Sequence, residues 1–221
     1  MKTKAVILKK QNTNEYDQLV TCYTEELGKM TAIAKSILRP SSIQSMHLDV
    51  LNLVDFELID GRVIPIITGA QVEKTYPTLK RSLPALAAGY FFAEIIDKAF
   101  FDYQKDENIW GLFLSLLEEL DDGSENIQEL LSSRKRKLIK ALGYAPNVTQ
   151  CSFCLEDNPT DLIAYSIHAR GVVCRSCFLS GQEAVVIKDG NFESDFVTEA
   201  IFESLLERKI NSLNFVKSVL G

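Results

Sequence analysis

The sequence predicts an α+β protein in which a strand-rich N-terminal part precedes a helical part that carries a four-cysteine module. Three observations predict this fold class. Residues 1–76 contain five or six short runs with the two-residue alternation of β-strands and no helical period. From residue 77 onward, apolar residues recur at helical spacing. Within residues 147–181, four cysteines form two C-x-x-C pairs.

Residues 1–76 are expected to form a small closed barrel or a sandwich, because five or six short strands without a helical period are typical of these folds. Leu27-Gly28 predicts a turn, and Asp60-Gly61 predicts a tight hairpin. Pro65 indicates an edge strand or a bulge, since proline cannot donate to a ladder. The expected strands are residues 5–8, 19–24, 29–34, 48–58, 63–67 and 71–76.

The helical part follows from a change of period at Pro77. Gly143 ends the third expected helix, as glycine often does after a last helical turn. We therefore expect one domain over residues 1–76 and a helical domain over 77–221, into which the cysteine module, 147–181, is inserted. The expected helices are residues 79–103, 109–120 and 125–142, followed by 195–207 and 210–220.

The cysteine pairs, Cys151 with Cys154 and Cys174 with Cys177, predict one structural Zn²⁺ site. Each C-x-x-C turn lets two thiolates converge, and two turns complete the tetrahedral sulfur set that zinc prefers, at about 2.3 Å. The alternatives are two disulfides or four unrelated core cysteines. Disulfides need an oxidising compartment, and nothing in the sequence indicates export. A closed four-sulfur site has no open position for substrate, so it stabilises a fold.

Two further residues have reactive side chains. Cys22 lies far upstream among apolar neighbours and is expected to be a small buried hydrophobe rather than a nucleophile. His168 lies between the cysteine pairs, but four cysteines already complete the coordination shell.

Composition limits the function. The net charge of −6 argues against a strongly basic nucleic-acid binder. Residues 1–45 nevertheless carry seven Lys and Arg against four acids, so a local basic face remains possible. We expect a cytoplasmic protein, because the N-terminal apolar run is too short for a signal peptide and no run reaches membrane-spanning length. Nucleotide-binding and metalloprotease motifs are absent and there are only two histidines, so we expect no enzyme.

Short motifs in a characteristic order resemble the RecO family of bacterial DNA repair and recombination mediators. Residues 14–21, 23–29 and 32–35 look like that family's opening motif, and 140–146 is similar to its linker into the zinc module. Residues 171–174 with Cys177 match its second cysteine pair. The resemblance implies an N-terminal OB-fold, a helical domain and zinc. It also implies a cytoplasmic, nucleoid-associated protein that binds single- and double-stranded DNA, anneals complementary strands and helps load recombinase onto DNA coated by single-strand-binding protein. The implied partners are RecR and the C-terminal tail of single-strand-binding protein.

OB barrels bind strands through a positive groove and stacked aromatics, so we expect Tyr16 or Tyr23 to stack on bases. After Lys35 the family usually has a glycine and several Lys or Arg, but residues 36–42 hold one arginine, which predicts weaker binding. The basic candidates for DNA binding are Lys9, Lys10, Lys29, Lys35 and Arg39.

The run 134–137 is the densest basic cluster and predicts either a solvated helix surface or a docking patch for an acidic tail. Successive helical residues are about 100° apart, so Arg134, Lys137 and Leu138 share one face, which we expect to meet the tail. A second function remains open, a zinc-ribbon transcription or translation factor, since zinc knuckles occur in such proteins. A mediator would bind single strands with little sequence preference, which separates the two.

Overall fold

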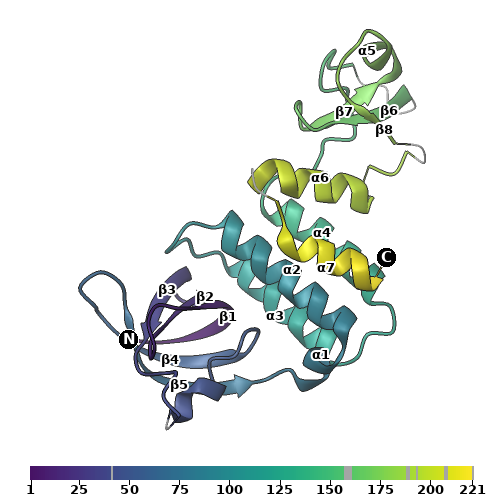
Figure 1. Cartoon of the computed structure of the whole chain (residues 1–221). Helices are drawn as coiled ribbons and strands as arrows, with labels where there is room; N and C mark the ends of the chain where they lie inside the picture. Colours follow the sequence, from purple (N-terminus) through teal and green to yellow (C-terminus); the bar gives the residue numbers. More distant parts are fainter. Residues whose placement is uncertain (41, 157–160, 188–189, 193, 207–208, 221) are drawn as a thin grey trace. The chain divides into compact units, whose positions relative to one another are not determined.

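A computed structural model describes residues 1–40, 42–156, 161–187, 190–192, 194–206 and 209–220 (Figure 1). The chain forms two compact units. The first comprises Met1–Gln128 together with Ile210–Gly221, and the second comprises Glu129–Lys209. None of the helices in the described residues combines the length and the apolar character needed to cross a membrane.

The N-terminal strands close into a five-stranded barrel in the order β1-β2-β3-β5-β4, which confirms the predicted fold class. Four of the strand pairs are antiparallel, and a short parallel pairing of β3 with β5 closes the barrel. Alternate side chains of these strands fill its interior, as the period of two requires. The strands are β1 (Lys2–Asn12), β2 (Gln18–Thr24), β3 (Gly28–Ala34), β4 (Leu53–Ile59) and β5 (Ile66–Lys74), and the short 3-10 helix η1 (Ile43–Met46) precedes β4.

Two predicted strands differ from the observed ones. The run 48–58 becomes a strand only at Leu53, because Leu51 has a left-handed backbone (φ 67°) and its buried side chain packs against Gly89. The predicted tight hairpin at Asp60-Gly61 is instead a longer loop, and the two runs expected after it form the single strand β5. Apolar content identified the buried residues correctly, but it did not show where the extended backbone begins.

Helices α1 (Pro77–Arg81), α2 (Leu83–Ala99), α3 (Glu107–Asp121) and α7 (Asn211–Leu220) complete the first unit. The single helix expected over 79–103 is divided at Ser82, whose hydroxyl accepts a hydrogen bond from the amide of Ala85 and caps α2. Asp106 caps α3 in the same way, accepting from the amides of Asn108 and Ile109. These caps satisfy helix-end amides that would otherwise lack partners.

Glu94 of α2 anchors the N-terminus of α7. Its carboxylate accepts the backbone amides of Asn211 at 2.9 Å and Ser212 at 2.7 Å, and it pairs with Lys98 at 2.5 Å. Burial raises the pKa of Glu94, but these donors outweigh burial and lower the pKa to about 2. The C-terminal helix is thereby tied to the helices that follow the barrel.

The barrel is docked on the segment between α2 and α3. The hydroxyl of buried Tyr23 accepts from the amide of Asp106 at 3.1 Å, and its ring lies 6.4 Å from that of Trp110. Gly28 has φ +70°, and a Cβ there would lie 2.0 Å from the carbonyl oxygen of Gln104. Only glycine permits this approach without displacing backbone.

The second unit contains most of α4 (Ile127–Ala141), the cysteine module and α6 (Asp195–Leu206). Strands β6 (Leu162–Ser166), β7 (Gly171–Cys174) and β8 (Val185–Val186) form an antiparallel sheet in the order β7-β6-β8, with the short helix α5 (Arg175–Leu179) after β7. Lys135 of α4 is buried and pairs with Asp195 at 3.3 Å and Glu199 at 2.8 Å on α6. This buried ion cluster joins the two helices that flank the module in the chain.

Candidate metal centre and nucleic-acid surface

The four cysteines of the two C-x-x-C pairs converge on one point, as their spacing predicts. The Sγ atoms of Cys151, Cys154, Cys174 and Cys177 all lie within 4.8 Å of one another. The Cys154 and Cys174 sulfurs are 3.8 Å apart, which equals the edge of a tetrahedron with Zn–S bonds of about 2.3 Å. None of the cysteines is in a disulfide. The donor set and its size therefore fit a four-coordinate zinc ion.

Backbone amides favour the thiolate form at one ligand. Cys151 Sγ accepts from the amide of Phe153 at 3.5 Å and from the amide of Cys174 at 3.4 Å. Burial raises the pKa of Cys151, but these amides outweigh burial and bring the pKa to about 6. Burial and the neighbouring sulfurs raise the pKa of Cys177 to about 12. A divalent cation would offset this mutual repulsion and hold all four groups as thiolates.

The chain around the cysteines is shaped for close packing. A glycine beside a cysteine pair often supplies a tight turn, but Gly171 lies in β7, where a Cβ would meet Ser152 Oγ at 2.0 Å. The Ser152 amide donates to the carbonyl of Val172 at 2.9 Å, which holds the first cysteine turn against β7. Gly181, with φ +94°, does provide a turn.

The fifth cysteine and His168 are not part of this cluster. Cys22 is fully buried in the barrel core, where burial raises the pKa of its thiol. His168 is exposed and does not belong to the cysteine group, which is the one metal-compatible cluster among the described residues.

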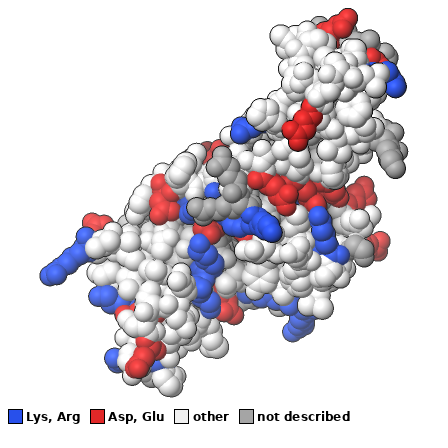
Figure 2. Space-filling view, turned by 45° about the horizontal axis from the view of Figure 1, so that its top comes forward, with Lys and Arg blue, Asp and Glu red and all other residues white. Residues whose placement is uncertain are grey.

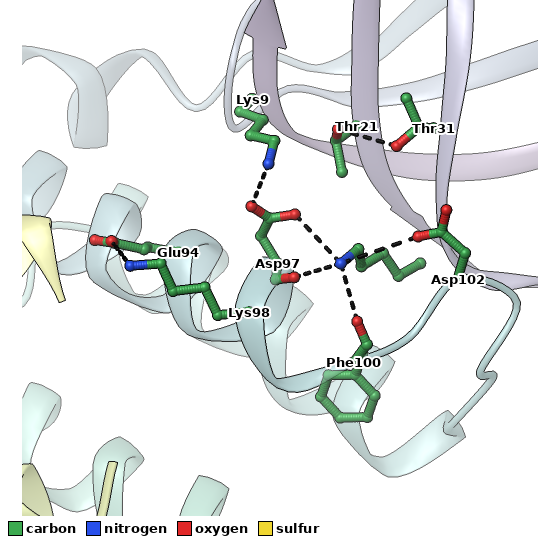
Figure 3. A network of polar contacts seen from close by, with 9 residues as sticks. Lys9, Thr21, Thr31, Glu94, Asp97, Lys98, Phe100 and Asp102 are labelled. Carbon is green, nitrogen blue, oxygen red and sulfur yellow. Dashed lines mark hydrogen bonds and ion pairs between the residues drawn. The ribbon is translucent and has the colours of Figure 1, made fainter. Parts of the chain in front are cut away.

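The predicted DNA-binding lysines of β1 and β3 are paired with carboxylates. Lys9 Nζ lies 2.5 Å from Asp97 of α2, and Lys10 Nζ lies 2.8 Å from Asp49. Lys29 is more deeply buried than these two lysines, with 15% of its side chain exposed. Its ammonium contacts the Asp97 carboxylate and carbonyl, the Phe100 carbonyl at 2.9 Å and, more distantly, Asp102 at 3.9 Å (Figure 3). Lys9 and Lys29 therefore bind the barrel to α2 and the segment after it, whereas Lys10 pairs with the segment between η1 and β4.

Lys35 and Arg39 are in a different situation. Both side chains are exposed, and neither forms an ion pair with another residue that the structure describes. The Arg39 guanidinium lies 5.1 Å from the ring centroid of Tyr16, which is 46% exposed. Of the two expected stacking residues, only Tyr16 is accessible, because Tyr23 is fully buried. On the face shown in Figure 2, basic and acidic side chains are interspersed, in keeping with the acidic net charge.

The basic run of α4 is divided between the interior and the surface. Lys137 is exposed, but Arg134 is 7% exposed and Leu138 is fully buried, so these three residues do not share an open face. The helical periodicity of α4 explains why Arg134 and Leu138 are buried while Lys137 is exposed. The buried residues of α4 recur at the spacing of one helix face, and they are Leu131, Arg134, Lys135, Leu138 and Ile139.

The fold and site together define a class: a modular protein with an OB-like barrel, helices and a four-cysteine cluster of zinc-binding geometry. The family model described as "Recombination protein O N terminal" matches residues 1–76, and that described as "Recombination protein O C terminal" matches residues 80–194. The chain belongs to the RecO family of DNA repair proteins.

Curated relatives extend over nearly the whole chain. "DNA repair protein RecO" of Dehalococcoides mccartyi (strain ATCC BAA-2100) is 29% identical over 95% of this chain and 83% of its own length. The protein of the same name from Acetivibrio thermocellus is 23% identical over 99% of this chain and 97% of its own length. That from Clostridium novyi is 26% identical over 97% of this chain and 80% of its own length.

Proposed function

We propose that this protein is a non-enzymatic, cytoplasmic mediator of DNA repair and recombination. It binds single- and double-stranded DNA, anneals complementary strands and helps load recombinase onto DNA coated by single-strand-binding protein. The observation that carries this proposal is the match of two RecO family models, in order, to a chain whose N-terminal part folds into an OB-like barrel. RecR is proposed as a partner through family membership, with no surface assigned to it.

Annealing tests this proposal directly. Two complementary oligonucleotides coated with single-strand-binding protein should form duplex faster when the protein is added. A Lys35→Ala, Arg39→Ala double variant should be slower, because both side chains are exposed cations on the barrel. Annealing no faster than the spontaneous rate, with zinc-loaded wild-type protein, would refute the mediator function.

We assign strand binding first to Lys35 and Arg39. Lys9, Lys10 and Lys29 contribute only where a phosphate replaces the carboxylate that each of them now contacts. Such an exchange is easiest for Lys9, whose side chain is 54% exposed, and hardest for Lys29. Each phosphate contact that is made or lost changes the salt slope of duplex binding by about 0.9.

We propose that Cys151, Cys154, Cys174 and Cys177 hold one structural zinc ion. The sulfur spacing and the amide donors around Cys151 support this assignment. Bound zinc would neutralise thiolate repulsion and stabilise the short sheet and helix of the module, with no part in a reaction. Elemental analysis of protein purified without chelator should give one zinc per chain, and protein without zinc would contradict the assignment.

We propose that the acidic tail of single-strand-binding protein docks on the exposed side of α4. Lys137 is the member of the predicted set on that surface, whereas Arg134 and Leu138 would take part only if the helix shifted. Lys137→Glu should weaken binding of a labelled tail peptide at least about tenfold, which is 1.4 kcal/mol. The matched control is Arg170→Glu, which reverses an exposed charge of the same unit outside α4. Equal effects of the two variants would remove Lys137 as a specific contact.

A further inference from the structure

Two loops of the barrel are joined by hydrogen bonds around one carboxylate. The loop after β1 contains residues 13–17, and the described part of the loop after β3 contains residues 35–40. Asp17 Oδ1 accepts from the amide of Ser36 at 2.6 Å, and the amide of Leu38 donates to the carbonyl of Tyr16 at 3.0 Å. These two hydrogen bonds hold the loops together, and each joins residues about 20 positions apart in the sequence.

Asp17 occupies a position that a neutral amide cannot fill equally well. Its second oxygen accepts from Asn14 Nδ2 at 3.0 Å. The side-chain oxygen Asn14 Oδ1 already accepts from the backbone amides of Tyr16 and Asp17, both at 2.8 Å. An asparagine at 17 would therefore turn its NH₂ group toward a donor, either Asn14 Nδ2 or the Ser36 amide. The carboxylate accepts from both, which is why the pKa of Asp17 is lowered.

The Asp17–Ser36 contact supports an unusual backbone. Ser36 has φ 56°, the left-handed conformation that non-glycine residues seldom adopt. This turn directs the chain so that Arg39 lies over the ring of Tyr16, with a cation–π distance of 5.1 Å. Tyr16, Asp17, Lys35 and Arg39 line one open depression on the barrel. Its two cations are therefore Lys35 and Arg39, the latter stacked on Tyr16, and the exposed carboxylate of Glu15 also lines it.

We propose that this depression binds an unpaired nucleotide, and that Asp17 is the positioning residue that assembles it. The base extends the Tyr16–Arg39 stack and a phosphate meets Lys35. Every base has a π-face, so the site is tolerant of sequence, but a base inside a duplex has no face free to stack. With only two cations, phosphate attraction is small, so stacking contributes most of the preference for single strands. This inference rests on the proposed DNA-binding function.

Charge removal provides the sharpest test, because simple electrostatics and positioning predict opposite signs. Asp17→Asn and Glu15→Gln each remove one negative charge from the same loop. The Glu15 side chain forms no hydrogen bond or ion pair with another residue in the described part of the chain. Electrostatics alone would make both variants bind DNA as tightly as wild type or more tightly. Positioning predicts that Asp17→Asn weakens binding of a fluorescent oligothymidylate about tenfold while Glu15→Gln does not.

A second pair of variants remains informative if Asp17→Asn is poorly folded. Tyr16→Leu should weaken oligothymidylate binding about tenfold and change binding of a blunt hairpin duplex less than about twofold, while Tyr16→Phe restores strand binding. A 2-aminopurine base placed in the oligothymidylate should be quenched by wild type and Tyr16→Phe but not by Tyr16→Leu. This optical signature reports stacking itself.

The outcomes separate this inference from the function on which it rests. If wild-type protein binds no single strand, the proposed DNA binding fails. If wild type binds, but Asp17→Asn binds as tightly as Glu15→Gln, then Asp17 is not a positioning residue. If Tyr16→Leu still quenches 2-aminopurine, the base stacks elsewhere and the site is wrong.

Discussion

Asp97→Asn should loosen the barrel from its helices, because this carboxylate contacts Lys9 and Lys29 at once (Figure 3). Asp97 and Lys29 each retain 15% side-chain exposure, so hydrogen bonds to charged groups of about 1.5–3 kcal/mol are at stake. The half-exposed Lys9 contact adds no more than about 1 kcal/mol. Asparagine keeps one acceptor but not the charge, so we expect a loss of about 2 kcal/mol in the free energy of unfolding.

Asp102→Asn is the matched control. It removes the same charge from the same network, but Asp102 lies 3.9 Å from Lys29 and is half exposed, so the expected cost is below about 0.5 kcal/mol. Urea unfolding can be followed through Trp110, the only tryptophan in the chain, whose ring stacks on Tyr23 where the barrel meets α3. The reasoning would be refuted if the two variants differed by less than about 0.5 kcal/mol, the range of ordinary surface substitutions.

The same pair of variants reports on DNA. Asp97→Asn leaves Lys9 without its carboxylate, so duplex binding should gain up to one phosphate contact and the salt slope should steepen by about 0.9. If Asp102→Asn steepened the salt slope equally, the cause would be the loss of one negative charge and not the release of Lys9 from its carboxylate.

Three further perturbations probe other parts of the fold. Cys174→Ala should abolish stoichiometric zinc and increase proteolysis of the second unit, because metal binding and folding are coupled; a zinc-free variant as resistant as wild type would contradict this. Gly28→Ala should cost about 2 kcal/mol or more, since its Cβ would lie 2.0 Å from the Gln104 carbonyl, whereas Gly123→Ala, also at positive φ but in open space, should cost only the backbone strain of about 1 kcal/mol. Glu94→Gln should be about 1–2 kcal/mol less stable at pH 7. The folded-state pKa of Glu94 lies below its ordinary 4.5, so this difference should persist above pH 4.5 and disappear as the pH falls toward about 2; a constant difference would disprove the α7 anchor.

Local sequence patterns predicted the barrel, the helical region and the cysteine cluster, although the bounds of several strands and helices differ from those expected. Strand alternation in residues 1–76 predicted the barrel, and two C-x-x-C pairs predicted four sulfurs within bonding distance of one ion. Both signals are local. Successive side chains of a strand point to opposite faces, and a C-x-x-C turn brings two thiols together within four residues of the chain. The burial of Arg134 and Lys135 was also present in the helical period of α4, but the charge of these residues concealed it.

Which cations remain available to a ligand depends on contacts between distant parts of the chain. Lys9 and Lys29 look equivalent to Lys35 in the sequence, yet their carboxylate, Asp97, lies 88 and 68 residues away and reaches them only when α2 packs against the barrel. The stack of Arg39 on Tyr16 likewise depends on two loops that the closed barrel brings together. A local pattern specifies the conformation of a few residues. The free energy of a charged side chain depends on the groups that folding places within a few ångströms of it, wherever they lie in the chain.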